Sequence, residues 1–86
     1  MSTAEVTVHV REGCHLCEEA LAVLRPLVAG HGARLAVVDI ESDDALHRRY
    51  LERIPVISLD GEELYDFFVD QEDLGRRLRS RRMGGA

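Results

Sequence analysis

Residues 6–29 read VTVHVREGCHLCEEALAVLRPLVA and hold the features that decide the fold. In residues 6–10, valine alternates with threonine or histidine, which is the period of a β-strand with one buried face. From residue 15 to about residue 29, apolar side chains recur every three or four positions, which predicts an amphipathic helix. Cys14 and Cys17 lie where the predicted strand gives way to the predicted helix. The segment therefore predicts a strand, a tight turn with a Cys-x-x-Cys pair, and a helix.

The rest of the chain predicts a second strand, a helix, a hairpin and a last helix. Leu35–Ile40 is apolar apart from Asp39, the pattern of a strand buried on both faces in parallel pairing. Asp60-Gly61 separates two further strand-like runs and favours a two-residue hairpin turn. The predicted order after the first helix is a strand at 35–40, a helix capped by Ser42 and ending by Arg53, strands at 56–59 and 62–65, and a helix at 71–82.

Length and composition limit the classes of protein that the chain can be. With 86 residues, 45% of them hydrophobic, it is expected to form one domain over residues 1–86. A formal net charge of −5 argues against nucleic acid as the main partner. The sequence shows neither a signal peptide nor an apolar run that would span a bilayer. We therefore expect a soluble, cytoplasmic protein with no nucleic-acid or membrane partner.

The only two cysteines of the chain point to redox chemistry. A pair three residues apart closes almost no loop, so it is a poor stabilising crosslink. A thiol at the start of a helix faces unpaired N–H groups and the positive end of the helix dipole, which favours the thiolate. We therefore assign Cys14 as the nucleophile and Cys17, one turn further on, as the resolving thiol. His15 either tunes the Cys14 thiolate or is an exposed histidine without an electronic role.

The order of elements, together with Ile54-Pro55 before the third strand, resembles the glutaredoxin and thioredoxin superfamily. The closer resemblance is to short bacterial glutaredoxin-like proteins whose active segment reads Gly-Cys-His-Leu-Cys, as residues 13–17 do here. It extends from Val6 to about Arg79. The resemblance implies an α/β, thioredoxin-like fold of glutaredoxin type, β-α-β-α-β-β-α, with a four-stranded mixed sheet and helices on both faces.

The resemblance also implies roles for three further residues. Pro55 would be cis and face the cysteine pair, and Ile54 would pair its backbone with an extended substrate; the alternative is a trans proline that merely ends a helix. Arg11 would meet a glutathione carboxylate, or else be an ordinary exposed arginine. Glutathione is thus a possible co-substrate, with no permanently bound cofactor. The expected partners are protein disulfides or glutathione mixed disulfides, and a cellular reductant.

The chain departs from the glutaredoxin pattern after the fourth predicted strand. Glutaredoxins usually carry a Gly-Gly turn and an acidic residue there, which hold the glutathione backbone, whereas this chain has Tyr65-Asp66-Phe67-Phe68. We expect Phe67 and Phe68 to be core residues or the rim of a groove beside the cysteines, and Asp70 to cap the last helix.

These observations predict a thiol–disulfide oxidoreductase that exchanges disulfides with protein or glutathione substrates, in electron transport and cell redox homeostasis. One alternative is a non-catalytic thioredoxin-fold module that senses redox state or binds a partner. A less favoured alternative is binding of a metal or an iron–sulfur cluster through Cys14 and Cys17. One chain supplies only two thiolates, and a structural zinc site needs four ligands, so we expect no metal site.

Overall fold

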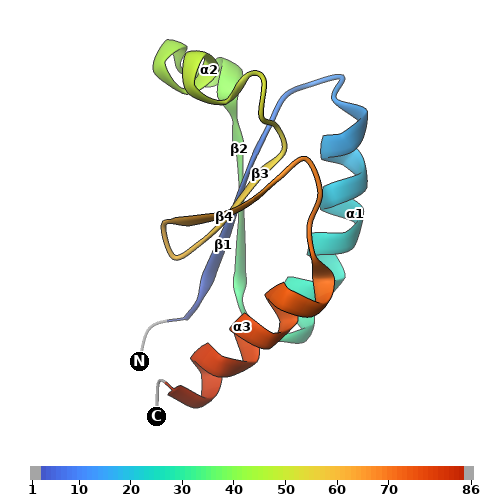
Figure 1. Cartoon of the computed structure of the whole chain (residues 1–86), viewed down its shortest axis with the longest axis vertical. Helices are drawn as coiled ribbons and strands as arrows, with labels where there is room; N and C mark the ends of the chain where they lie inside the picture. The colour runs from blue at the N-terminus through green and yellow to red at the C-terminus, as the bar shows by residue number, and fades with distance from the viewer. Residues whose placement is uncertain (1–2, 85–86) are drawn as a thin grey trace.

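A computed structural model describes the backbone of residues 3–84 and the side chains of residues 3–81. The elements follow in the order predicted from the sequence (Figure 1). Residues 1–2 and 85–86 of the expected domain lie outside the described part. The elements are β1 (Glu5–Val10), α1 (His15–Gly30), β2 (Arg34–Asp39), a 3-10 turn η1 (Ile40–Ser42), α2 (Asp44–Tyr50), β3 (Val56–Leu59), β4 (Glu62–Asp66) and α3 (Gln71–Gly84).

The four strands form one mixed sheet in the order β2-β1-β3-β4. β1 is parallel to β2, whereas β3 is antiparallel to both β1 and β4. Register places His9, Val56 and Asp66 side by side across three strands. The end of β1, the start of β3 and the end of β4 therefore share one end of the sheet, where α1 also begins (Figure 1). Segments far apart in sequence thus meet near the cysteine pair.

Helices cover both faces of the sheet, as expected. α1 and α3 pack on one face, where alternate residues of β1 and β3 are buried with apolar residues of both helices. α2 lies against the opposite face, where the Tyr50 ring stacks on the His9 ring with centroids 4.3 Å apart. Full burial of one such aliphatic side chain stabilises the fold by about 1.5–3 kcal/mol. The main core comprises Val6, Val8, Ala20, Leu24, Val28, Ile57, Leu59, Leu74 and Leu78.

The expectation that the second strand is buried on both faces was wrong. β2 pairs only with β1 and forms an edge of the sheet, and Val37 within it is 44% exposed. The apolar run at residues 35–40 instead crosses the boundary between β2 and η1. It ends at Ile40, which belongs to η1 and is fully buried with Tyr50 and Val56 in a second, smaller core.

The cap expected for the second helix was also wrong. Asp43, not Ser42, is the N-cap of α2, and its carboxylate accepts a hydrogen bond from the Ala45 N–H at 2.7 Å. Ser42 instead donates to the Asp39 carbonyl within η1. Both residue types are favoured as caps, so the intervening 3-10 turn decides which of them precedes the helix. α2 ends at Tyr50, before the predicted limit of Arg53.

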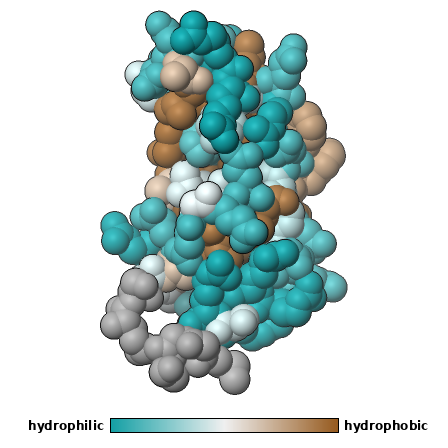
Figure 2. Space-filling model, turned by 60° about the vertical axis from the view of Figure 1, so that its left-hand side comes forward, coloured by the Kyte–Doolittle hydropathy of each residue, from teal (hydrophilic) through white to brown (hydrophobic). Residues whose placement is uncertain are grey.

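On the face shown in Figure 2, the surface is mainly hydrophilic around α3, with hydrophobic patches over the middle and the upper part of the molecule. Within the described part, no helix combines the length and the apolarity that crossing a bilayer requires.

Candidate active site

The cysteine pair lies at the first turn of α1. Cys14 is the N-cap of the helix with extended backbone angles, and its sulfur accepts a hydrogen bond from the Cys17 N–H at 3.1 Å. Gly13 precedes it with a φ of +79°, a conformation that strains any residue with a Cβ. The Cys14 N–H donates to the Arg11 carbonyl and closes the turn between β1 and α1. The turn at Gly13 therefore places the Cys14 sulfur at the N-terminus of α1.

The two cysteines form a disulfide, with 5.2 Å between their Cα atoms. They differ in access to solvent, because Cys17 is only 2% exposed whereas Cys14 is partly exposed. In the reduced state, free N–H groups and the dipole at the start of α1 would stabilise a thiolate on Cys14. The arrangement suits attack on an external disulfide by the partly exposed Cys14 sulfur, followed by attack of the buried Cys17 sulfur on the resulting mixed disulfide.

His15 lies on the solvent side of the helix and contacts acidic side chains. Its side chain is 83% exposed, and its Nε2 atom is 3.4 Å from a carboxylate oxygen of Glu19. Its Nδ1 atom is 4.0 Å from a carboxylate oxygen of Glu18. With these contacts, the His15 ring lies along the surface of α1. A role in tuning Cys14 remains a prediction.

Arg11 follows β1, and its backbone forms part of the cysteine turn. Its Nε atom is 3.5 Å from a carboxylate oxygen of Glu41, and both side chains are nearly half exposed. The Arg11 guanidinium therefore already contacts a carboxylate, that of Glu41 on η1. A carboxylate ligand that bound Arg11 would compete with Glu41.

The Ile54–Pro55 peptide bond is cis, as the resemblance implied. Pro55 is fully buried, and its carbonyl accepts a hydrogen bond from the Phe67 N–H at 2.8 Å. Ile54 is partly buried and packs against the second core. This segment therefore lies directly beside the Phe67-Phe68 segment at the end of the sheet where α1 begins.

A charged cluster that the sequence did not reveal fixes this end of the sheet. Arg53, two residues before Pro55, donates to both oxygens of Asp66 at 3.1 and 3.2 Å and to Glu63 at 2.6 Å. The Tyr50 hydroxyl also donates to Glu63, at 2.8 Å. Hydrogen bonds from Arg53 first, and from Tyr50 second, lower the pKa of Glu63 to about 2. The cluster joins the chain before Pro55 to the strand that ends at Phe67.

The His9 imidazole belongs to the same region. Burial against the Tyr50 ring lowers its pKa, and this effect outweighs the opposing influence of the Glu63 carboxylate. Burial and the hydrogen bond to Glu63 raise the pKa of Tyr50. We therefore expect His9 and Tyr50 to be neutral packing partners under the sheet end, rather than acid–base groups.

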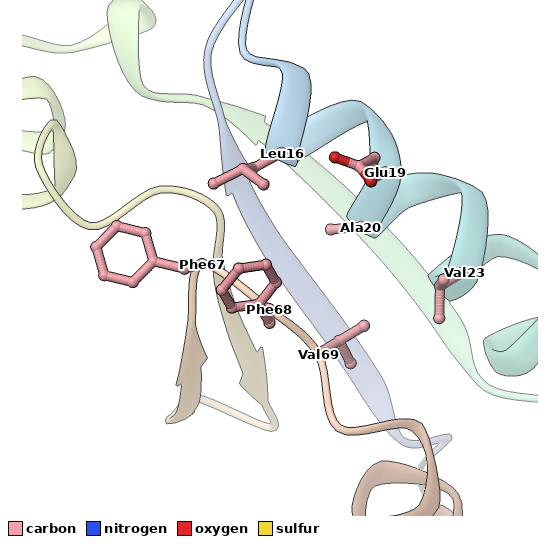
Figure 3. A pocket seen from close by; sticks show the side chains of 7 residues that line it. All are labelled: Leu16, Glu19, Ala20, Val23, Phe67, Phe68 and Val69. Atoms are coloured by element: carbon pink, nitrogen blue, oxygen red, sulfur yellow. The ribbon is translucent and has the colours of Figure 1, made fainter.

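A groove lies between α1 and the segment that follows β4 (Figure 3). It encloses about 180 Å³. Leu16, between the two cysteines in sequence, forms its wall on α1 together with Ala20 and Val23. Phe67, Phe68 and Val69 form the other wall. Phe67 and Phe68 are 42% and 70% exposed, so they are rim residues and not core residues. The adjacent phenylalanines were a visible signal in the sequence, but their exposure was not.

The expected cap of the last helix is confirmed, because the Asp70 carboxylate accepts a hydrogen bond from the Asp73 N–H at 3.0 Å. Among the described residues, no three histidine, cysteine, aspartate or glutamate side chains are grouped so that they could hold a metal ion.

Comparison with known proteins agrees with this fold. The profile of the Glutaredoxin-like domain (DUF836) family matches residues 5–79. The structure is similar to that of protein Ne2328 from Nitrosomonas europaea, with 35% identity, a TM-score of 0.75, and coverage of 90% of this chain and 93% of that one. It is also similar to protein XcR50 from X. campestris, with 33% identity, a TM-score of 0.69, and coverage of 87% and 96%.

A thioredoxin from Halobacterium salinarum shares the fold, at 23% identity and a TM-score of 0.67 over 92% of this chain and 74% of that one. The comparison with curated proteins found no match. The molecule is thus a thioredoxin-fold protein with a disulfide-forming cysteine pair at the start of α1. More narrowly, the chain belongs to the glutaredoxin-like domain family.

Proposed function

We propose that this protein is a thiol–disulfide oxidoreductase in which Cys14 is the nucleophile and Cys17 the resolving thiol. The observation that carries the proposal is the Cys14–Cys17 pair at the N-terminus of α1, bonded to each other and unequal in exposure. The family match and the thioredoxin-like fold support the same class of chemistry.

The proposed reaction is a two-electron exchange. In the reduced protein, the Cys14 thiolate attacks a substrate disulfide, forms a mixed disulfide with one substrate sulfur and releases the other as a thiolate, which takes a proton from solvent. Cys17 loses its proton and attacks the Cys14 sulfur, which forms the Cys14–Cys17 disulfide and releases the second substrate thiolate. The substrate is reduced and the protein oxidised. A dithiol, or two glutathione molecules, then reduces the protein.

The protein's own groups contribute position and charge stabilisation. The Cys17 N–H already points at the Cys14 sulfur at 3.1 Å, so it would donate to a thiolate there without rearrangement. The burial of Cys17 keeps it from external disulfides, so that it reacts only after Cys14 has formed a mixed disulfide. We propose protein disulfides and glutathione mixed disulfides as the substrates.

The test is turnover of bis(2-hydroxyethyl) disulfide and of a protein disulfide, with glutathione or dithiothreitol supplied in turn. Wild-type protein should exceed the rate of an equal concentration of a small dithiol, and Cys14→Ser should abolish the gain. If wild-type protein gave no acceleration although its disulfide formed and broke reversibly, the non-catalytic redox-sensing module would be the better account.

A further inference from the structure

The Phe67-Phe68 segment has a backbone that costs free energy to hold. Phe67 has a φ of +68°, and the Phe68 N–H donates to the Asp66 carbonyl at 2.7 Å, which closes a three-residue turn around Phe67. An aromatic residue rarely adopts positive φ, and such strain persists where the surroundings enforce it, often at functional sites. The hydrogen bond from the Phe67 N–H to Pro55 and the Arg53–Asp66 contacts enforce it here.

The strained turn leaves the rings of Phe67 and Phe68 exposed to solvent instead of buried. In Figure 3 the Phe68 ring points toward α1, and the Phe67 ring projects on the other side of the turn. Phe68 is 70% exposed, although burial of its ring elsewhere would be favourable. The turn therefore maintains an aromatic wall that faces Leu16, the residue between the two cysteines. A ligand in this groove would contact Leu16, which lies between the two cysteines in sequence.

The charge around the groove is acidic. Glu19 lines it, and Glu18 lies beside Glu19 on the first turns of α1, with their side chains 62% and 75% exposed. Among the described side chains, no lysine, arginine or histidine lines the groove, and His15, outside it, contacts the carboxylates of both Glu18 and Glu19. Glutathione is an anionic peptide with two carboxylates, so it would meet an apolar wall and like charge. A chain with an apolar side chain and a neighbouring cationic one matches both features.

We propose that this groove docks an extended segment of a protein substrate, with an apolar side chain against Phe68 and a lysine or arginine beside Glu18 and Glu19, next to the disulfide being exchanged. The proposal rests on the proposed function and names its substrate class. At about 180 Å³, the groove holds several times the ~30 Å³ that one water occupies in the liquid, which is room for one apolar side chain.

The experiment uses peptides that carry one cysteine in a mixed disulfide with 2-mercaptoethanol. One peptide has leucine and arginine near the cysteine, a second has glutamate in place of the arginine, and a third has serine in place of the leucine. Wild-type protein should show a kcat/KM at least about tenfold higher for the first peptide than for either of the others, and than for the glutathione mixed disulfide. Equal values for all four substrates would overturn the proposal.

Two variants locate the effect. Phe68→Ser should remove the preference for leucine, and Glu19→Lys should reverse the preference between arginine and glutamate. Leu51→Ser, which alters an exposed apolar residue outside the groove, is the matched control and should keep both preferences. Retention of both preferences in Phe68→Ser and Glu19→Lys would place docking elsewhere.

A binding measurement separates this proposal from the proposed function. Oxidised protein is titrated with the first peptide bearing serine in place of cysteine, and NMR shifts are followed at Ala20, Val23 and Val69. Shifts that saturate for wild-type protein and weaken at least about fivefold in affinity for Phe68→Ser support docking even without turnover. Absence of shifts at these residues refutes docking, whereas failure to turn over bis(2-hydroxyethyl) disulfide refutes only the proposed function.

Discussion

Replacing Glu63 by glutamine removes the negative charge at the centre of the cluster that fixes the end of β4 to the segment before Pro55. The Glu63 carboxylate accepts hydrogen bonds from Arg53, Tyr50 and Arg49 at 2.6, 2.8 and 3.4 Å. Glutamine keeps the size and one acceptor oxygen but not the charge. We therefore expect Glu63→Gln to fold and to be less stable.

The magnitude follows from the pKa. Hydrogen bonds from Arg53 first and Tyr50 second lower the pKa of Glu63 from 4.5 to about 2. At about 1.4 kcal/mol per pKa unit, this difference corresponds to at most about 3.4 kcal/mol of stability. Because 27% of the side chain is exposed, solvent screens part of the interaction, and we expect a loss of about 2 kcal/mol at pH 7.

The loss has a defined pH dependence. The folded-state pKa lies below the unfolded-state value, so the unfolded state takes up a proton first as the pH falls. The stabilisation by ionised Glu63 is therefore complete above about pH 4.5 and disappears as the pH falls toward about 2. The difference in stability between wild-type protein and Glu63→Gln should shrink over that window.

Urea denaturation at a series of pH values between 7 and 2 measures the free energy of unfolding of both proteins. Glu62→Gln is the matched control, because Glu62 lies on the same strand, is exposed and makes no ion pair with the described side chains. It should differ little from wild-type protein. A difference for Glu63→Gln that is absent at pH 7, or that does not change between pH 7 and pH 2, would refute this reasoning.

Three further substitutions test other parts of the structure. Gly13→Ala should cost about 1 kcal/mol in urea denaturation because φ is +79°, whereas Gly30→Ala, with open space at the Cβ, should be neutral or stabilising; equal effects would contradict the strained turn. Leu24→Ala should cost about 2–5 kcal/mol in the same assay, against about 0.5 kcal/mol or less for exposed Leu51→Ala, and similar losses would place the core wrongly. Arg53→Ala should speed hydrogen exchange at the Phe67 N–H more than Arg49→Ala does, because only Arg53 also bonds Asp66; equal rates would show that the Asp66 contacts do not hold this turn.

The sequence predicted the order of elements because strong local signals marked each boundary. Gly13 and Asp60-Gly61 adopt positive φ in the turns predicted between these elements, and the predicted last helix buries Leu74 and Leu78. The edge position of β2 was not predictable in this way. An apolar run gives the same pattern in a central strand and in an edge strand that leads into a buried turn at Ile40.

The cysteine pair was predictable, but its surroundings were not. The Cys-x-x-Cys at a strand-to-helix boundary is a local pattern, and the structure places the pair where that pattern indicated. The contacts of Arg53 with Glu63 and Asp66 join residues at least 10 positions apart. The exposure of Phe68 depends on a turn at Phe67 that a β-propensity argument would not favour. Both features arise from tertiary packing rather than from periodicity.

The most direct test of the account is to trap the proposed intermediate. Reduced Cys17→Ser is mixed with the mixed disulfide of a peptide and 2-mercaptoethanol, and the products are analysed by mass spectrometry under non-reducing conditions. The account predicts a stable adduct on Cys14, no adduct when Cys14→Ser is treated in the same way, and turnover without accumulation in wild-type protein. The assignment of the nucleophile would be contradicted if the Cys14→Ser variant formed an adduct on Cys17 while the Cys17→Ser variant formed none on Cys14.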